Sequence, residues 1–178
     1  RNALVGAGLK DRIRLGAAGK VVSGAGLAIN MAVGADWCNA ARAFMFSLGC
    51  VQSMKCHTGD CPTGVATQDP FRQRGLVIGD KAERVYQFQK QTVSALRDIV
   101  VAMGLENPWQ IRPHHLHERL NSAKSSSIDY IYPFLENRVL IEAPDDTPYA
   151  QYWAAAQTSS FRARPSVKQT LHDQDADP

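Results

Sequence analysis

The sequence predicts an α/β fold with a parallel sheet, and it does so through one strand–helix–strand pattern and one long amphipathic helix. The stretch "DRIRLGAAGKVV" (11–22) has β-branched residues near both ends, as strands often do. Ser23 then opens a helical stretch, and "DWCNAARAFMF" (36–46) reads as a second strand entering a loop or helix. A strand, a helix and a strand within about 35 residues form a βαβ unit, whose two strands run parallel.

The elements at the start of the chain follow from local signals. Residues 1–10 are typical of the end of a helix or of a loop. Ser23 is a good helix N-cap, and Gly34 supplies the helix stop, because glycine readily adopts the left-handed conformation that ends helices. The second strand is expected over residues 36–42.

The strongest helix signal covers residues 81–103. Apolar or small side chains recur there at steps of three and four, which gives the helix one apolar face: Val85, Phe88, Thr92, Leu96, Ile99 and Met103. Asp80 with Glu83 suggests a capping box at its start, and Gly104 suggests its end.

The later part of the chain predicts shorter elements. "PWQIRPHHLHERL" (108–120) opens another short helix, and 126–141 is a packed irregular segment, since Pro133 interrupts it. "YAQYWAAAQ" (149–157) predicts one docked helix. "HDQDADP" (172–178) has the composition of a disordered tail.

Composition narrows the function classes. The chain has 178 residues, 44% of them hydrophobic, which is enough for a domain with a buried core. Twenty basic and 17 acidic side chains give a net charge of +3 with no basic run, so we expect no nucleic-acid partner. The most apolar stretch contains Asp36, Asn39 and Arg42, so no transmembrane helix fits. No signal peptide is visible, and we expect a cytoplasmic protein whose native N-terminus precedes Arg1.

Three of the four cysteines lie in the short stretch "CVQSMKCHTGDCPTG" (50–64). Cys50, Cys56 and Cys61 could be buried free thiols, or two of them could form a disulfide and leave the third unpaired. They could also bind zinc together with His57, although structural zinc sites usually have shorter cysteine spacings. The fourth alternative is an iron–sulfur cluster, which needs a longer loop wrapped around it.

Chemistry favours the cluster among these alternatives without excluding zinc. Gly49, Gly59 and Gly64 would let the loop wrap around a cluster, because glycine adopts backbone angles closed to other residues. Pro62 directly follows the last cysteine, as in ferredoxin-type cysteine runs. We therefore expect the three sulfurs to converge on one small volume. Cys38 lies apart on the second strand and is expected to be a buried core thiol.

The cysteine motif resembles the glutamate synthase family, in its FMN-binding synthase domain. The resemblance rests on "SLGCVQSMKCHTGDCPTGVATQDP" (47–70) and on "AAGKVVSGAGLAINMAVGAD" (17–36) upstream of it. It extends through helix 81–103 and "RPHHLHERL…SSSIDYIYPFLENRVL", so it covers about residues 11–141. The "GK" pair makes the chain most similar to the shorter glutamate synthase-like FMN proteins. "HTGDC" departs from the family, which usually has Asn-Thr before the last cysteine.

The resemblance implies the C-terminal part of a (β/α)8 TIM barrel that binds FMN and a [3Fe–4S] cluster. By analogy, Cys50, Cys56 and Cys61 would hold the cluster. The domains implied are the last βα units (1–46), the cluster loop (47–70), a helical extension (71–142) and a partly disordered tail (143–178). The reaction implied is the reductive formation of L-glutamate from 2-oxoglutarate and glutamine-derived ammonia.

The same resemblance places the flavin phosphate beside the two strands, which would be the last two of the barrel. The residues implied follow the first strand, open the next helix or follow the second strand: Gly19, Lys20, Ser23, Gly24, Ala41 and Arg42. Glycine lets backbone N–H groups approach a phosphate, and lysine and arginine supply positive charge. The two turns are therefore expected to lie side by side.

The partners implied are the remaining N-terminal part of the barrel, or another chain supplying it, and an electron donor such as ferredoxin or an NAD(P)H-oxidising subunit. Two strands alone cannot form a stable parallel sheet, so this stretch by itself is expected to be inactive, to bind FMN weakly and to expose an apolar strand edge. The alternative function is a non-catalytic metal-binding module for electron transfer or docking. His114, His115 and His117 suggest a metal site, but a solvated helix start is the better interpretation.

Overall fold

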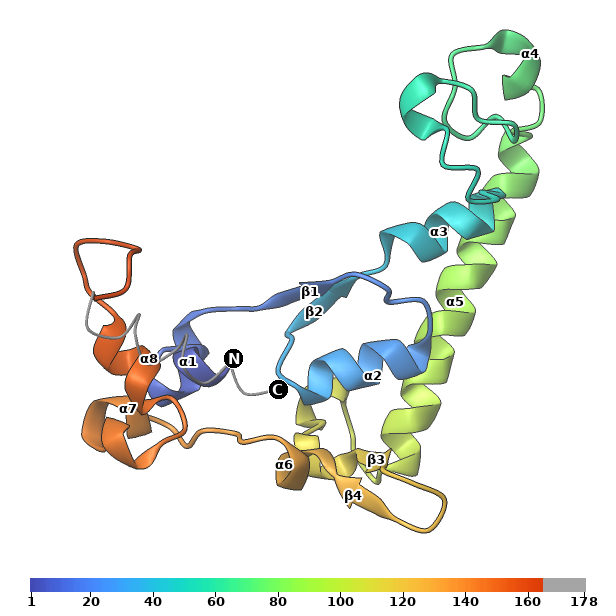
Figure 1. Ribbon diagram of the computed structural model, residues 1–178. Coiled ribbons are helices and arrows are strands. Elements are labelled where there is room, and N and C mark those ends of the chain that lie inside the picture. Colours follow the sequence, from blue (N-terminus) through green and yellow to red (C-terminus); the bar gives the residue numbers. More distant parts are fainter. Residues whose placement is uncertain (165–178) are drawn as a thin grey trace. The chain divides into compact units, whose positions relative to one another are not determined.

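The computed structural model describes residues 1–164 and divides the chain into two compact units (Figure 1). One unit combines residues 1–14 with the described residues from Asp129 to Arg164, and the other spans Leu15–Ile128. The fold is mixed α and β, with helices and two small sheets. The predicted α/β class is thus confirmed at this level, and the domain boundaries drawn from the sequence stay a prediction.

The central unit begins with the predicted βαβ arrangement. Strand β1 (Gly16–Ala18) pairs in parallel with β2 (Trp37–Asn39), and helix α2 (Gly24–Ala32) connects them. The register sets Gly16 opposite Trp37, where the indole ring occupies the space that a β-carbon on Gly16 would need. Both strands are shorter than the predicted ranges 11–22 and 36–42, because regular pairing covers three residues of each.

Helix α5 (Ile78–Ala102) forms the long axis of this unit, and α2 and α3 (Ala41–Leu48) both pack against it (Figure 1). Phe44 on α3 meets Phe88 on α5 edge to face, with ring centroids 5.1 Å apart. The core lies between α2, α5 and the turn after α5. Its buried members are Ala28, Ala32, Val100 and Ile111.

The predicted capping box at the start of α5 is wrong. The helix begins at Ile78, and the N–H of Lys81 already donates to the carbonyl of Val77 at 3.0 Å. Asp80 therefore lies inside the first turn, where its negative charge favours the helix N-terminus. Glu83 instead accepts a hydrogen bond from Gln87 at 2.7 Å. The predicted end is confirmed, because Gly104 is left-handed with φ +73°.

Short elements complete the central unit. The helix predicted in 108–120 is wrong, since two 3-10 turns form there, Pro108–Gln110 (η3) and Pro113–His115 (η4). The proline at the start of each turn removes one backbone donor, which favours a short turn over a continuous helix. Strands β3 (His117–Arg119) and β4 (Ser125–Ser127) then form an antiparallel hairpin.

The other unit is built from short helices. They are listed in chain order: α1 (Asn2–Gly6), η1 (Lys10–Arg12), α6 (Ile128–Ile131, at the junction of the units), α7 (Val139–Glu142), η5 (Pro144–Asp146) and α8 (Ala150–Ala155). Asn2 ties the unit together, because its side-chain amide donates to the carbonyl of Pro133 and to the hydroxyl of Tyr149. Gly6 lets α1 pack directly on Leu140.

The expectations for this region are mostly confirmed. Residues 126–141 are irregular apart from short elements, and α8 lies within the helix predicted for 149–157. The disorder predicted for 172–178 lies outside the described residues.

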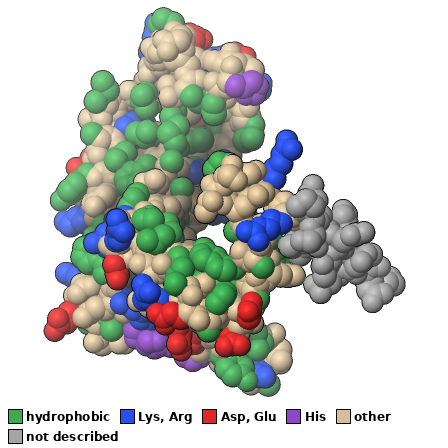
Figure 2. Space-filling model, turned by 90° about the vertical axis from the view of Figure 1, so that its left-hand side faces the viewer, with side chains coloured by type: hydrophobic (Ala, Val, Ile, Leu, Met, Phe, Trp, Pro, Cys, Tyr) green, Lys and Arg blue, Asp and Glu red, His purple; other side chains and the backbone are tan. Residues whose placement is uncertain are grey.

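Many large hydrophobic side chains reach the surface, as Figure 2 shows, and beside the parallel sheet Val22 is 48% and Trp37 49% exposed.

Candidate functional site

The cysteine loop joins two helix ends. It leaves α3 through Gly49, which is left-handed with φ +107°, and it ends at Asp69, the N-cap of α4 (Pro70–Gln73). Inside the loop a 3-10 turn, Cys56–Thr58 (η2), is closed by Gly59 in a left-handed conformation. Glycine is needed at these two turns because a side chain would strain the backbone there.

The three loop cysteines differ in exposure. Cys50 is half-buried, Cys56 is exposed, and Cys61 is buried with 5% of its surface accessible. All three are free thiols, so the disulfide alternative is not present in the structure. The loop therefore combines one buried cysteine with one exposed cysteine.

Hydrogen bonds around Cys61 favour its thiolate. Its Sγ lies 3.4 Å from the hydroxyl oxygen of Thr63. This hydroxyl, followed by the backbone N–H groups of Ala66, Thr63 and Val65, lowers the pKa of the Cys61 thiol to about 7. The thiolate is the form of cysteine that binds metals, so Cys61 is electrostatically suited to be a ligand.

The three sulfurs are not gathered into one site. Among residues 1–164, no three His, Cys, Asp or Glu side chains are arranged to hold a metal ion. The predicted convergence is therefore not seen in this structure. The kind of donor still fits a cluster, because three unpaired thiols lie on one loop and one of them is stabilised as a thiolate. Between the first two cysteines, Gln52 and Met54 have left-handed backbones with φ +55° and +58°.

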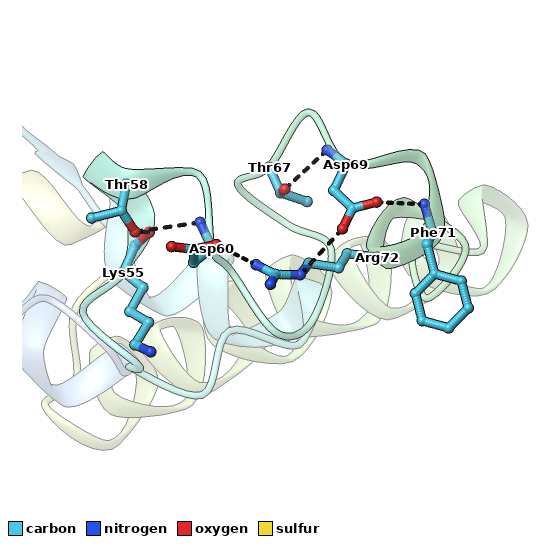
Figure 3. A network of polar contacts seen from close by, with 7 residues as sticks. All are labelled: Lys55, Thr58, Asp60, Thr67, Asp69, Phe71 and Arg72. Carbon is cyan, nitrogen blue, oxygen red and sulfur yellow. Dashed lines mark hydrogen bonds and ion pairs between the residues drawn. The ribbon is translucent and has the colours of Figure 1, made fainter.

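Helix α4 closes the other half of the loop through an arginine. The guanidinium of Arg72 lies between two carboxylates (Figure 3). Its Nη1 is 2.9 Å from Oδ1 of Asp60, and its Nε is 3.3 Å from Oδ2 of Asp69. The first contact holds the pKa of Asp60 below its ordinary value, mainly through the hydrogen bond from Arg72. Asp60 directly precedes Cys61, so the arginine fixes the backbone beside the buried sulfur.

The predicted phosphate-binding turns lie at the same edge of the parallel sheet. Ala18 and Asn39 are register partners at the ends of β1 and β2, so Gly19–Lys20 and Ala41–Arg42 both follow this edge. The expectation that both segments follow one edge is met by this register, and a shared phosphate pocket there stays a prediction. Lys20 and Arg42 are exposed, and neither forms an ion pair within the described part of the chain.

Ser23 and Gly24 stabilise the start of α2 at this edge. The Ser23 hydroxyl accepts a hydrogen bond from the N–H of Gly26 at 3.2 Å, so it caps α2. Gly24 lies against α5, where an added β-carbon would be 2.6 Å from the backbone nitrogen of Leu96. The sequence did not reveal this packing role, because it depends on a residue 72 positions away. A phosphate contact at Ser23 and Gly24 stays a prediction.

The remaining candidate residues are Cys38 and the three histidines of the stretch 114–117. Cys38 lies on β2 and is half-buried rather than fully buried, and burial raises the pKa of its thiol. His115 accepts a hydrogen bond from the N–H of Arg112 at 2.9 Å and caps a 3-10 turn. The ring of His114 lies beside it at a tilt of 55°, with ring centroids 4.1 Å apart, and His117 lies exposed on β3. His114 and His117 are thus exposed as expected, whereas the predicted helix start is wrong, because the three histidines lie on a 3-10 turn and a strand.

Sequence reasoning missed the residues that shape the loop: Asp60, Thr63, Arg72 and the contact made by Gly64. The spacing of Asp60 and Arg72 by twelve residues matches no helix or strand period, so only the folded loop reveals the pair.

Within residues 1–164, no helix has both the length and the apolarity to cross a membrane.

The central unit thus combines a parallel βαβ arrangement, a sheet edge followed by Lys20 and Arg42, and a separate loop with three free cysteines. A family described as "Conserved region in glutamate synthase" matches residues 1–106. The glutamate synthase large subunit-like protein YerD of Bacillus subtilis is 34% identical over 122 residues, which are 68% of this chain and 23% of that protein. The large chain of the Bacillus subtilis NADPH glutamate synthase is 32% identical over 99 residues, or 56% of this chain and 6% of that protein.

The chain belongs to the glutamate synthase family. The ferredoxin-dependent glutamate synthase 2 of Arabidopsis thaliana also matches, at 38% identity over 65 residues, 36% of this chain and 4% of that protein. The resemblance inferred from the cysteine motif is therefore confirmed. The chain spans less than a quarter of the length of each of these three relatives.

Proposed function

We propose that this chain forms the C-terminal part of the FMN-binding (β/α)8 barrel of a glutamate synthase-type oxidoreductase. In this proposal β1 and β2 are the last two strands of the barrel, and the loop after α3 is the iron–sulfur loop. The whole protein would form L-glutamate reductively from 2-oxoglutarate and glutamine-derived ammonia. The observation that carries the proposal is the loop of three unpaired cysteines in a chain of this family.

The donor set supports a [3Fe–4S] cluster held by Cys50, Cys56 and Cys61. Such a cluster would pass single electrons to the flavin. Cys61 is already held in place with its thiolate favoured, whereas Cys56 is exposed. The loop would therefore have to close around the cluster on binding. The free energy of metal binding would then also stabilise the closed form of the loop.

The sheet edge supports a site for the phosphate of FMN. Lys20, in the turn after β1, and Arg42, at the start of α3, supply two exposed positive charges that follow the same sheet edge, and the N-terminus of α2 also favours an anion. Gly19 has φ +99° and open space around it, so backbone N–H groups can be approached closely. Gly24 would contribute its backbone alone.

The partners proposed are the strands that complete the barrel and an electron donor, either ferredoxin or an NAD(P)H-oxidising subunit. Parallel sheets are usually covered on both faces, whereas Val22 and Trp37 are about half exposed beside this two-stranded sheet. That exposure supports further protein packing here. We propose a cytoplasmic location in line with reductive biosynthetic chemistry.

The proposal is tested by anaerobic reconstitution of the chain with iron and sulfide. We expect broad visible absorption and about three bound irons for every four sulfides, because three thiolates suit a [3Fe–4S] cluster. The measurements are the absorption spectrum and metal analysis. A colourless protein that binds zinc instead would contradict the proposal and favour a non-catalytic metal-binding module.

Removing both charges at the sheet edge is expected to weaken FMN binding. The double variant Lys20→Gln with Arg42→Gln should lose about thirtyfold in FMN affinity, because it removes two charge-assisted contacts to the phosphate, each worth about 1 kcal/mol. Riboflavin, which lacks the phosphate, should bind equally to both proteins. Equilibrium dialysis with the two flavins measures this difference.

Lys124→Gln provides the matched control, since this lysine is exposed on the β3–β4 turn. It should leave both affinities unchanged. Equal affinity of the unaltered protein for FMN and riboflavin would show that no phosphate site exists at this edge.

A further inference from the structure

We propose that Arg72 is a positioning residue that holds Cys61 in place for cluster binding. The inference rests on the proposed function in taking Cys61 as a cluster ligand. It goes further by naming a residue that is not a ligand and by predicting that one half of the loop is organised before any metal arrives. The contacts of α4 with the loop carry it.

Arg72 connects two parts of the loop that lie nine residues apart. One nitrogen contacts Asp60, directly before Cys61, and another contacts Asp69, the N-cap of α4 (Figure 3). Asp69 also accepts a hydrogen bond from the N–H of Phe71 at 2.8 Å, so it is fixed to the start of the helix. The guanidinium therefore anchors the chain beside Cys61 to the end of the loop.

The backbone supports the same closure. A β-carbon on Gly64 would collide with the carbonyl oxygen of Arg72, so the loop lies directly on α4 there. The side chain of Gln73 donates to the carbonyl of Thr67 at 2.9 Å. Val65 and Ala66 lie between these contacts and Thr63 lies just before them, and the hydrogen bonds of all three favour the Cys61 thiolate.

The fork of the arginine side chain suits this role. Two different nitrogens, Nη1 and Nε, face the two carboxylates, and a lysine has a single nitrogen on a flexible stem. Exposed ion pairs contribute little singly, but Arg72 is only 35% exposed and joins two of them. We therefore expect a moderate effect on how often the segment around Cys61 opens.

The test uses metal-free protein and measures how fast iodoacetamide alkylates each cysteine, read by peptide mass spectrometry. Cys56 is exposed and serves as the internal reference. In Arg72→Gln we expect Cys61 to react about fivefold faster relative to Cys56, because the open population rises by the free energy of two partly exposed ion pairs. Arg72→Lys should restore part of the protection.

Arg74→Gln is the matched control, because Arg74 lies over the ring of Phe71 and not between carboxylates. It should leave the ratio unchanged. Asp60→Asn should raise the ratio by itself and add little to Arg72→Gln, since both remove the same contact. An unchanged ratio in both Arg72→Gln and Asp60→Asn overturns the proposal, as does an equal increase in Arg74→Gln. If Arg72→Gln fails to fold, Asp60→Asn and Arg72→Lys decide the question.

A second readout follows reconstitution with iron and sulfide. Arg72→Gln should lose its visible absorption to a chelator several times faster than the unaltered protein, whereas Arg74→Gln should not. Failure of the unaltered protein to take up iron and sulfide would contradict the proposed function, while alkylation would still judge whether Arg72 holds Cys61. Normal cluster retention in Arg72→Gln would overturn the positioning role.

Discussion

Replacing Gly24 with valine is expected to lower the free energy of unfolding by about 3 kcal/mol, at the upper end of the range for overpacked sites. The side chain would meet the backbone of α5, at 2.6 Å from the nitrogen of Leu96 and 2.8 Å from the carbonyl carbon of Ala95. A backbone cannot rotate away as a side chain can, so α2 and α5 would have to separate. Urea unfolding followed by far-ultraviolet circular dichroism measures the loss.

Gly26 provides the control for this prediction, because it lies on the same helix two residues later. A β-carbon there would meet only the hydroxyl oxygen of Ser23 at 3.6 Å, an ordinary contact. Gly26→Ala should therefore change stability by between zero and a gain of about 1 kcal/mol, since alanine favours helices over glycine. Equal stability losses in the two variants would show that packing on α5 is not the cause.

Replacing Cys61 with serine is expected to abolish cluster binding. Serine preserves the size of the side chain, but its hydroxyl is a poor ligand for iron at neutral pH compared with a thiolate. After anaerobic reconstitution, visible absorption and bound iron should fall to background. Iron analysis and the absorption spectrum measure this result.

Cys38→Ser is the matched control, because Cys38 lies on β2 outside the loop. It should retain the full absorption and iron content of the unaltered protein. A Cys61→Ser protein that keeps its cluster while Cys38→Ser loses it would assign the ligands differently and contradict the proposed loop.

Local signals predicted the elements whose cause is local. Ser23 caps α2 as expected, and Gly104 ends α5, because both effects depend on a few neighbouring residues. The predicted start of α5 was wrong, because Asp80 and Glu83 match a capping box whether or not the backbone before them is already helical. Strand lengths were overestimated, since β-branched residues show a preference for extended backbone but not where pairing stops.

The candidate site was predictable in its parts and not in its assembly. The cysteine spacing identified the loop, and parallel pairing placed Lys20 and Arg42 at one edge. The contacts of Arg72 with Asp60 and Asp69 could not be predicted, because they depend on α4 folding back onto the loop. The role of Gly24 was hidden for the same reason, since its partner lies far along the chain.

The contact of Gly64 with α4 also determines where the loop can change its length. From Gly64 to Arg72 the chain leaves and returns to a direct backbone contact, so an inserted residue there would shift the internal hydrogen bonds of Thr67 and Asp69 out of register. Between Cys50 and Cys56 the chain is mostly exposed and makes two left-handed turns at residues that are not glycine. An inserted residue in that half would leave the contacts of α4 intact and change only the spacing of the proposed ligands Cys50 and Cys56, so it would separate the folding of the loop from cluster binding.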